Sequence, residues 1–210
     1  MPRDGSATRE RILNATESLV LDHGFAGTSL DMVLTETGIT KGAFFYHFRG
    51  KGELARALVE RYSEQDLANL EAYMARAERL SRDPLQQVLI FVGLYEEAAG
   101  ALTEPYPGCL FASYCYESRQ FDPATIGVIN TTFDRWRERL GSKFEAVLAA
   151  YPPRLPVDAA GLADLLTTVF EGAFILSKTR GEPEVVAAHL RHYRNYLELL
   201  FGVVPAPEGT

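Results

Sequence analysis

The sequence predicts an all-α protein with a small N-terminal domain and a larger C-terminal domain. Apolar residues recur at helical spacing along most of the 210 residues, and the sequence shows no strand-like alternation or internal repeat. Short helical segments with glycine-containing turns occupy the N-terminal quarter, whereas longer segments follow. We expect about nine helices in total.

The N-terminal quarter predicts three short helices. The first ends at Gly24, because glycine favours the left-handed conformation at a helix C-terminus, and its apolar face comprises Ile12, Ala15, Leu19 and Val20. Thr28-Ser29-Leu30-Asp31 has the pattern of an N-cap with an acid at the third helical position, so a second helix is expected to begin there and to end at Gly38. Thr40 caps a third helix over 41–48.

The second and third helices have the turn length of a helix-turn-helix unit, with the motif at about 29–48. They are joined through Gly38-Ile39-Thr40, and glycine permits the positive φ that a sharp change of direction requires. A fourth helix is expected to begin at Lys51 and to continue well beyond the first domain.

Longer helices are predicted after the fourth, separated by segments rich in proline and glycine. Their expected spans are 85–101, 109–119, 122–150, 158–179 and 183–201. We expect the helix-turn-helix domain, the larger helical domain and a tail to occupy 1–52, 53–203 and 204–210.

Charge is distributed unevenly along the chain, which has a net charge of −7. Residues 1–62 carry eight Lys or Arg and eight Asp or Glu, whereas residues 63–210 carry thirteen and twenty. DNA repels an acidic domain, whereas a neutral domain with placed cations can bind DNA in a salt-dependent manner. Such an imbalance is also common among soluble proteins.

Composition indicates a cytoplasmic protein without a membrane partner. The N-terminus lacks the apolar core of a signal peptide, and no apolar run approaches transmembrane length. The two cysteines, Cys109 and Cys115, fit a reducing compartment. Neither metal-ligand spacing nor a cofactor motif is present, so we expect no cofactor.

Two lysines at predicted helix starts indicate phosphate binding. A cation in the first turn opposes the helix dipole, so folding alone does not favour Lys41 or Lys51 there. A phosphate does favour them, because helix N-termini attract anions. Tyr46 and His47 can donate hydrogen bonds to phosphate oxygens, and Gly42 permits close approach to base edges. The alternatives are solvated surface lysines and a core histidine.

The segment from Arg9 to Leu54, roughly a quarter of the chain, resembles the DNA-binding head of the TetR family of transcriptional repressors. The resemblance is carried by Gly38-Ile39-Thr40-Lys41-Gly42, then Phe45-Tyr46-His47-Phe48, then Lys51 and Leu54. It implies a homodimer whose third helices enter successive major grooves of a palindromic operator in double-stranded DNA.

The resemblance also implies roles for individual residues. Groove contacts are implied for Thr40, Lys41, Gly42 and Phe45, and phosphate contacts for Thr28, Tyr46, His47 and Lys51. Phe45 stands where the family commonly has tyrosine, so one hydroxyl contact is absent. We also expect contacts from an N-terminal arm containing Arg3, Arg9 and Arg11.

The larger domain has no catalytic constellation, so we expect no enzyme. Aromatic and apolar residues cluster there instead, and the resemblance implies that they line a pocket for a small organic ligand. The candidates are Phe91, Tyr95, Cys109, Phe111, Tyr114, Phe133, Trp136, Phe170 and Phe174. The alternative is plain core.

Cys109 is a candidate sensor within that set. Pro107-Gly108-Cys109-Leu110 places it at a helix start, where unsatisfied amides favour the thiolate. A Gly-Cys-Leu segment at this place recurs in a subgroup of the family, some members of which respond to electrophiles or oxidants. The alternative is a small buried hydrophobic residue.

The last two helices predict a dimer interface. Their apolar stripes contain Leu162, Leu165, Leu166, Val169, Leu190, Tyr193, Tyr196, Leu197 and Leu200. In the family such a pair packs on the same pair of a second subunit as a four-helix interface. The alternative is burial in the monomer core.

We therefore expect a ligand-responsive transcriptional repressor, released from its operator by a small molecule or by modification of Cys109. One alternative is a helical small-molecule-binding protein or enzyme that uses the C-terminal pocket without binding DNA. Another is a helical interaction module that keeps the head's fold without its DNA function.

Overall fold

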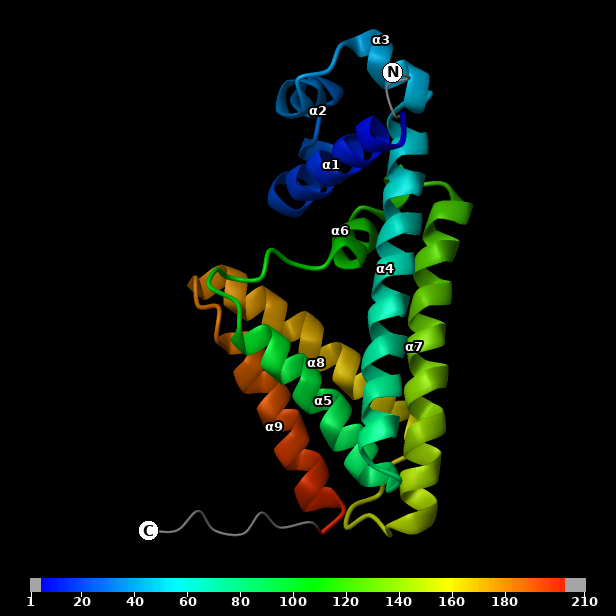
Figure 1. Ribbon diagram of the computed structural model, residues 1–210, viewed down its shortest axis with the longest axis vertical. Helices are drawn as coiled ribbons and strands as arrows, with labels where there is room; N and C mark the ends of the chain where they lie inside the picture. The colour runs from blue at the N-terminus through cyan, green and yellow to red at the C-terminus, as the bar shows by residue number, and fades with distance from the viewer. Residues whose placement is uncertain (1–4, 203–210) are drawn as a thin grey trace. The chain divides into compact units, whose positions relative to one another are not determined.

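The computed structural model describes residues 5–202, so Arg3 and the predicted tail at 204–210 lie outside the described residues. Within them the chain is all-helical, as predicted (Figure 1). The α-helices are α1 (Gly5–Gly27), α2 (Leu30–Thr37), α3 (Lys41–His47), α4 (Lys51–Leu80), α5 (Pro84–Gly100), α6 (Leu110–Tyr116), α7 (Pro123–Ala150), α8 (Ala159–Arg180) and α9 (Val185–Leu200), with a 3-10 helix η1 (Ser118–Gln120).

The helices form two compact units. The head unit comprises the chain up to residue 66 together with 107–132, and the body unit comprises 67–106 and the chain from residue 133 onward. The head unit is larger than the predicted domain over 1–52, because α6 packs against α1. The boundary at residue 52 concerns function and stays a prediction.

Local capping sets the helix boundaries of the head unit. The Ser29 hydroxyl accepts a hydrogen bond from the Met32 amide at 3.2 Å, and the Thr40 hydroxyl accepts one from the Ala43 amide at 3.2 Å. Gly38 ends α2 in the left-handed conformation, with φ 65°. The predicted Thr40 cap is confirmed, and within the segment predicted to cap the second helix the capping residue is Ser29, so α2 begins at Leu30.

Helix α1 breaks at Gly24, where φ is 74° and ψ is 167°. The break turns the Phe25 side chain into the core of the head unit. The predicted apolar face is correct at Ile12 and Val20, whereas Ala15 and Leu19 are only half-buried.

The expected helix over 109–119 is divided into α6 and η1. The backbone of Glu117 leaves the α-helical region, with φ −108° and ψ 23°, and the chain continues as the 3-10 turn. Cys109 precedes the first residue of α6, as predicted. Both cysteines are thiols; Cys109 is buried and Cys115 is exposed.

The body unit is built around α5, α8 and α9, which lie side by side (Figure 1). Because α9 packs against both α5 and α8, its apolar side chains point into the unit. The buried Tyr193 of α9 links this helix to α8, because its hydroxyl donates a hydrogen bond to the carbonyl of Leu162 at 2.7 Å.

This packing corrects the predicted dimer interface. Six of the nine proposed interface residues are buried in the core of the body unit: Leu162, Leu166, Leu190, Tyr193, Leu197 and Leu200. Val169 and Tyr196 are half-buried, and Leu165 is exposed. The prediction chose the inward faces, because both faces of these helices carry apolar residues.

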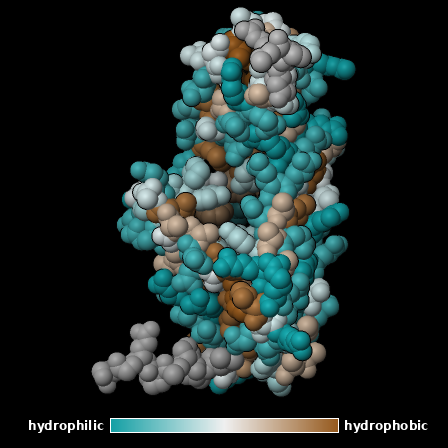
Figure 2. Space-filling view, viewed as in Figure 1, coloured by the Kyte–Doolittle hydropathy of each residue, from teal (hydrophilic) through white to brown (hydrophobic). Residues whose placement is uncertain are grey.

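The exposed side of α8 is also apolar. By length and composition alone, α8 could cross a membrane, contrary to the expectation from the sequence, and only 22% of its most apolar stretch is buried. Core helices of soluble proteins satisfy the same criteria. On the face shown in Figure 2, hydrophilic residues cover most of the surface and hydrophobic residues gather in separate patches.

Candidate nucleic-acid interface

Helix α3 separates its aromatic rings between core and surface. Phe44 and Phe48 are fully buried, with ring centroids 5.8 Å apart, and they attach the helix to the head unit. Phe45 and Tyr46 lie on the other side, 45% and 83% exposed. The four-residue spacing of Phe44 and Phe48 in the sequence predicts this shared orientation, because residues four apart lie on one face of a helix.

The exposed side of α3 displays the predicted groove residues together. Thr40, Lys41 and Gly42 are exposed at its N-terminal end, and the ring of Phe45 follows one turn later. His47 is half-buried and packs edge-on against the Tyr46 ring at 5.0 Å. This surface therefore combines a cation, a hydroxyl group and an apolar ring on one short helix.

Thr28 does not share this surface. Its side chain is 2% exposed, and its hydroxyl donates a hydrogen bond to the carbonyl of Gly24 at 2.8 Å. Thr28 thus supplies a hydrogen-bond donor to the backbone carbonyl at the break in α1. The predicted phosphate contact by this side chain is incompatible with this arrangement, because the hydroxyl is turned into the head unit.

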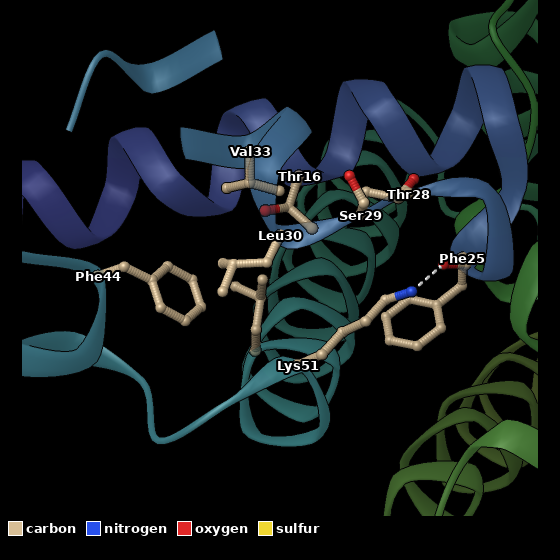
Figure 3. Close-up of a pocket in the computed structure, with 9 residues that line it drawn as sticks. Thr16, Phe25, Thr28, Ser29, Leu30, Val33, Phe44 and Lys51 are labelled. Atoms are coloured by element: carbon tan, nitrogen blue, oxygen red, sulfur yellow. Dashed lines mark hydrogen bonds between the residues drawn. The ribbon is translucent and has the colours of Figure 1, made fainter. Parts of the chain in front are cut away.

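Lys51 is engaged within the head unit. Its ammonium donates a hydrogen bond to the carbonyl of Phe25 at 2.6 Å and lies 4.3 Å from the centroid of the Phe25 ring (Figure 3). Partial burial lowers the pKa of the Lys51 ammonium below its ordinary value, and the Glu117 carboxylate counteracts the shift. An ammonium has three N–H donors, so two remain for a phosphate.

A small pocket lies beside Lys51 (Figure 3). Its walls are mainly apolar and its volume is about 10 Å³, which is no more than a single water molecule occupies. The lining residues are Thr16, Phe25, Thr28, Ser29, Leu30, Val33, Phe44, Lys51 and Leu54. The pocket is therefore too small for an organic effector. Nor do residues 5–202 bring three or more His, Cys, Asp or Glu together as a metal site.

The predicted ligand-pocket residues divide between the two units. Cys109, Phe111 and Tyr114 belong to the head unit, where the Phe111 ring lies 4.9 Å from that of Tyr62. The other six belong to the body unit. The sequence pattern could not reveal this division, because the head unit includes a segment from the middle of the chain.

Five body-unit rings form an aromatic cluster: Phe91, Tyr95, Trp136, Phe170 and Phe174. Tyr95 lies at its centre, with ring centroids 5.2 Å from Phe91, 5.9 Å from Trp136 and 5.2 Å from Phe170. Tyr106, which the sequence reasoning missed, stacks on Phe174 at 4.1 Å. Phe133 is half-buried in the same unit.

Residues 12–58, which include the helix-turn-helix pair, match the family model described as bacterial regulatory proteins, tetR family. The chain belongs to the TetR family. It is a DNA-binding transcriptional regulator, and TetR-family regulators are not enzymes.

Two curated relatives illustrate this TetR membership. The chain is 24% identical over 200 residues to the transcriptional regulator AcuR of Cereibacter sphaeroides, covering 90% of this chain and 85% of AcuR. It is 38% identical over 55 residues to the transcriptional repressor NemR of Escherichia coli, covering 26% of this chain and 28% of NemR.

Solved TetR-family structures share the fold along the chain. A TetR-family regulator from Agrobacterium tumefaciens superposes with a TM-score of 0.75 at 21% identity, covering 94% of this chain and 100% of that one. The reduced form of E. coli NemR gives a TM-score of 0.65 at 22% identity, covering 90% and 96%.

The two lysines are expected to differ in what they contribute. Lys41→Met should lower the slope of log affinity against log salt by about 0.9, the value for one lost phosphate contact on duplex DNA, without changing thermal stability. Lys51→Met should lower the salt slope and the thermal stability, because it also removes the hydrogen bond to the Phe25 carbonyl. Fluorescence anisotropy over a salt series and thermal unfolding measure the two effects.

The matched control for these lysine variants is Arg76→Met, which removes an exposed cation from the body-unit part of α4. It should leave the salt slope unchanged. An unaltered slope in Lys41→Met as well would contradict the assignment of Lys41 to a phosphate.

Proposed function

We propose that this TetR-family regulator is a cytoplasmic repressor that binds a palindromic operator as a homodimer and leaves it when an effector is bound. The N-terminal domain over 1–52 contacts DNA, and the domain over 53–203 binds the effector and dimerises. The observation that carries the proposal is the exposed face of α3, held outward by the burial of Phe44 and Phe48. The name of NemR, a repressor whose similarity lies in a 55-residue segment, supports the repressor role.

The exposed α3 side chains suit direct reading of the major groove. Lys41 can bind phosphate or guanine, and the Thr40 hydroxyl can bind either class of base edge. The Phe45 ring lacks a hydroxyl, so it suits apolar contact with a thymine methyl group. Tyr46, His47 and Lys51 are assigned to the phosphates.

The homodimer is supported by the outer face of α8 and α9. On α8 the exposed residues Leu165, Thr168, Gly172 and Ile175 follow one another at helical spacing, and on α9 His192, Asn195 and Leu199 do the same. Ile175 is 55% and Leu199 is 56% exposed. A second copy of the same pair would cover this face as a four-helix interface.

A charge on this face should separate the dimer. Ile175→Asp is expected to yield monomers at micromolar concentration, because the interface would have to bury an unpaired carboxylate. Operator affinity should then fall by about a hundredfold or more, since two linked half-site contacts become one. Sedimentation velocity and operator titration measure the two effects.

Leu80→Asp is the matched control, because Leu80 is similarly exposed but belongs to α4 and not to the α8–α9 pair. It should remain dimeric. If Ile175→Asp also remains dimeric, this face is not the interface.

The effector is proposed to be a small organic molecule that binds at the aromatic cluster of the body unit. Aromatic walls with a few polar groups are typical of such sites, and the cluster carries a tyrosine hydroxyl and an indole. An effector that prefers the state not bound to DNA weakens operator binding by the same coupling energy, typically ~1–3 kcal/mol.

Modification of Cys109 is the second proposed route to release. Cys109 stands at the start of α6, where a thiolate is favoured, but it is only 9% exposed. The similar protein NemR of E. coli has been solved in a reduced form, and this supports a redox-sensitive group in this chain.

Treatment with N-ethylmaleimide should abolish operator binding by wild type and by Cys115→Ser, whereas Cys109→Ser should still bind. Cys115→Ser is the control because it removes the exposed thiol and leaves the buried one. Mass spectrometry confirms which thiol has reacted. Full binding by wild type modified at Cys109 would leave a noncovalent effector as the only route.

Selection of bound fragments from genomic DNA at low ionic strength tests the function itself. We expect a palindrome whose half-sites are about 34 Å apart, one turn of DNA. Thr40→Ala should relax the preference at one position of each half-site, at a cost of about 1–3 kcal/mol. Indifference to every palindrome would favour the alternatives of a small-molecule-binding protein or an interaction module.

A further inference from the structure

A carboxylate from the middle of the chain closes the corner between α1 and α2. Glu117 lies between α6 and η1, and its Oε1 accepts a hydrogen bond from the Phe25 amide at 2.8 Å. Its Oε2 accepts one from the Ala26 amide at 2.7 Å and another from the Gln120 side chain at 2.8 Å. All of these residues belong to the head unit.

The break at Gly24 makes these two amides available. Because the backbone of Gly24 is not helical, the amides of Phe25 and Ala26 lie beyond the regular hydrogen bonding of α1. Successive amides that point the same way form a site for an anion. Glu117 fills that site with both oxygens of one carboxylate.

Aromatic packing holds Glu117 at this corner. Tyr114 precedes Glu117 in the sequence and Phe121 follows it, and their rings stack with centroids 4.2 Å apart and an interplanar angle of 5°. The Phe25 ring packs against Phe121, with centroids 4.6 Å apart. The Tyr114 hydroxyl donates a hydrogen bond to the carbonyl of Ala55 at 2.9 Å. The segment that carries Glu117 is therefore attached to α4 through Tyr114, and its carboxylate binds the corner.

Lys51 binds the same corner with a positively charged group. Its ammonium binds the Phe25 carbonyl (Figure 3), whereas Glu117 binds the Phe25 amide. Both groups of one peptide segment are thus fixed by opposite charges from α4 and from the α6–η1 turn. Ser29, the cap of α2, follows only a few residues later, so the conformation of the corner affects how α2, and with it α3, is placed against α1.

We propose that Glu117 is a positioning residue for operator binding, which fixes the α1–α2 corner and thereby the placement of the recognition helix α3. It contacts no DNA in this role. Loss of its carboxylate lets the corner sample other arrangements, and apparent affinity falls in proportion to the fraction of molecules that stays competent.

Glu117→Gln tests the positioning role, because it keeps the size of the side chain and one carbonyl oxygen while it removes the charge and the second acceptor. We expect operator affinity to fall about tenfold, as it would if the competent corner were kept by about a tenth of the molecules. The salt slope should stay unchanged, since no phosphate contact is lost. Hydrogen exchange at the Phe25 and Ala26 amides should accelerate.

Glu104→Gln is the control, because it makes the same charge change at an exposed residue of the body unit. It should bind the operator as wild type does. Glu117→Asp, which keeps the charge but is shorter by one methylene, should lose less affinity than Glu117→Gln.

A double-mutant cycle with Gly24 tests the contact directly. A Cβ added at Gly24 would lie 2.6 Å from Oε1 of Glu117, so Gly24→Ala must displace the carboxylate. We expect Gly24→Ala to weaken operator binding in both backgrounds, because alanine is strained at φ 74° and ψ 167°, but to weaken it clearly more in wild type than in Glu117→Ala, because only wild type also loses the carboxylate contact.

Three results would overturn the proposal. Glu117 is structural only if Glu117→Gln and Glu117→Asp both lower the unfolding temperature yet, when folded, bind the operator as Glu104→Gln does. Tighter binding by Glu117→Gln would show that the carboxylate opposes DNA electrostatically. Equal effects of Gly24→Ala in both backgrounds would show that the two positions act independently.

Discussion

Burial of two phenylalanines supports the proposed DNA-binding surface of this protein. Helix α3 has only seven residues, too few to be stable alone in water. Phe44 and Phe48 supply the missing free energy by entering the core of the head unit, and the four-residue spacing directs both rings to one side. Because these two rings are buried, the residues on the opposite side of α3, including Lys41, Phe45 and Tyr46, are exposed to solvent.

The corner between α1 and α2 follows a second constraint, that buried backbone groups need partners. Gly24 interrupts α1, and the groups it leaves without helical partners are satisfied by Thr28, by Lys51 and by Glu117. Two of these three side chains carry charge and come from other helices or turns. The head is thus fixed by polar contacts at its corner as much as by its apolar core.

In the body unit, α8 and α9 use two faces for different purposes. The inward face, with Leu162 and Tyr193, forms the core against α5. The outward face keeps Ile175 and Leu199 exposed, and covering such residues favours association. The aromatic cluster around Tyr95 lies within the core of the same unit, so we propose that effector binding and dimerisation share one set of helices.

The sequence alone determined the features that depend on near neighbours. The Thr40 cap and the inward rings Phe44 and Phe48 follow from spacings of three or four residues, which a helix converts directly into contacts, and the cap of α2 was located to within one residue. Only the tertiary structure decided the partners of Lys51 and Glu117, because the residues they bind lie 26 to 92 positions away. It also decided which apolar face of α8 is buried, since both faces suit a core and only packing against other helices distinguishes them.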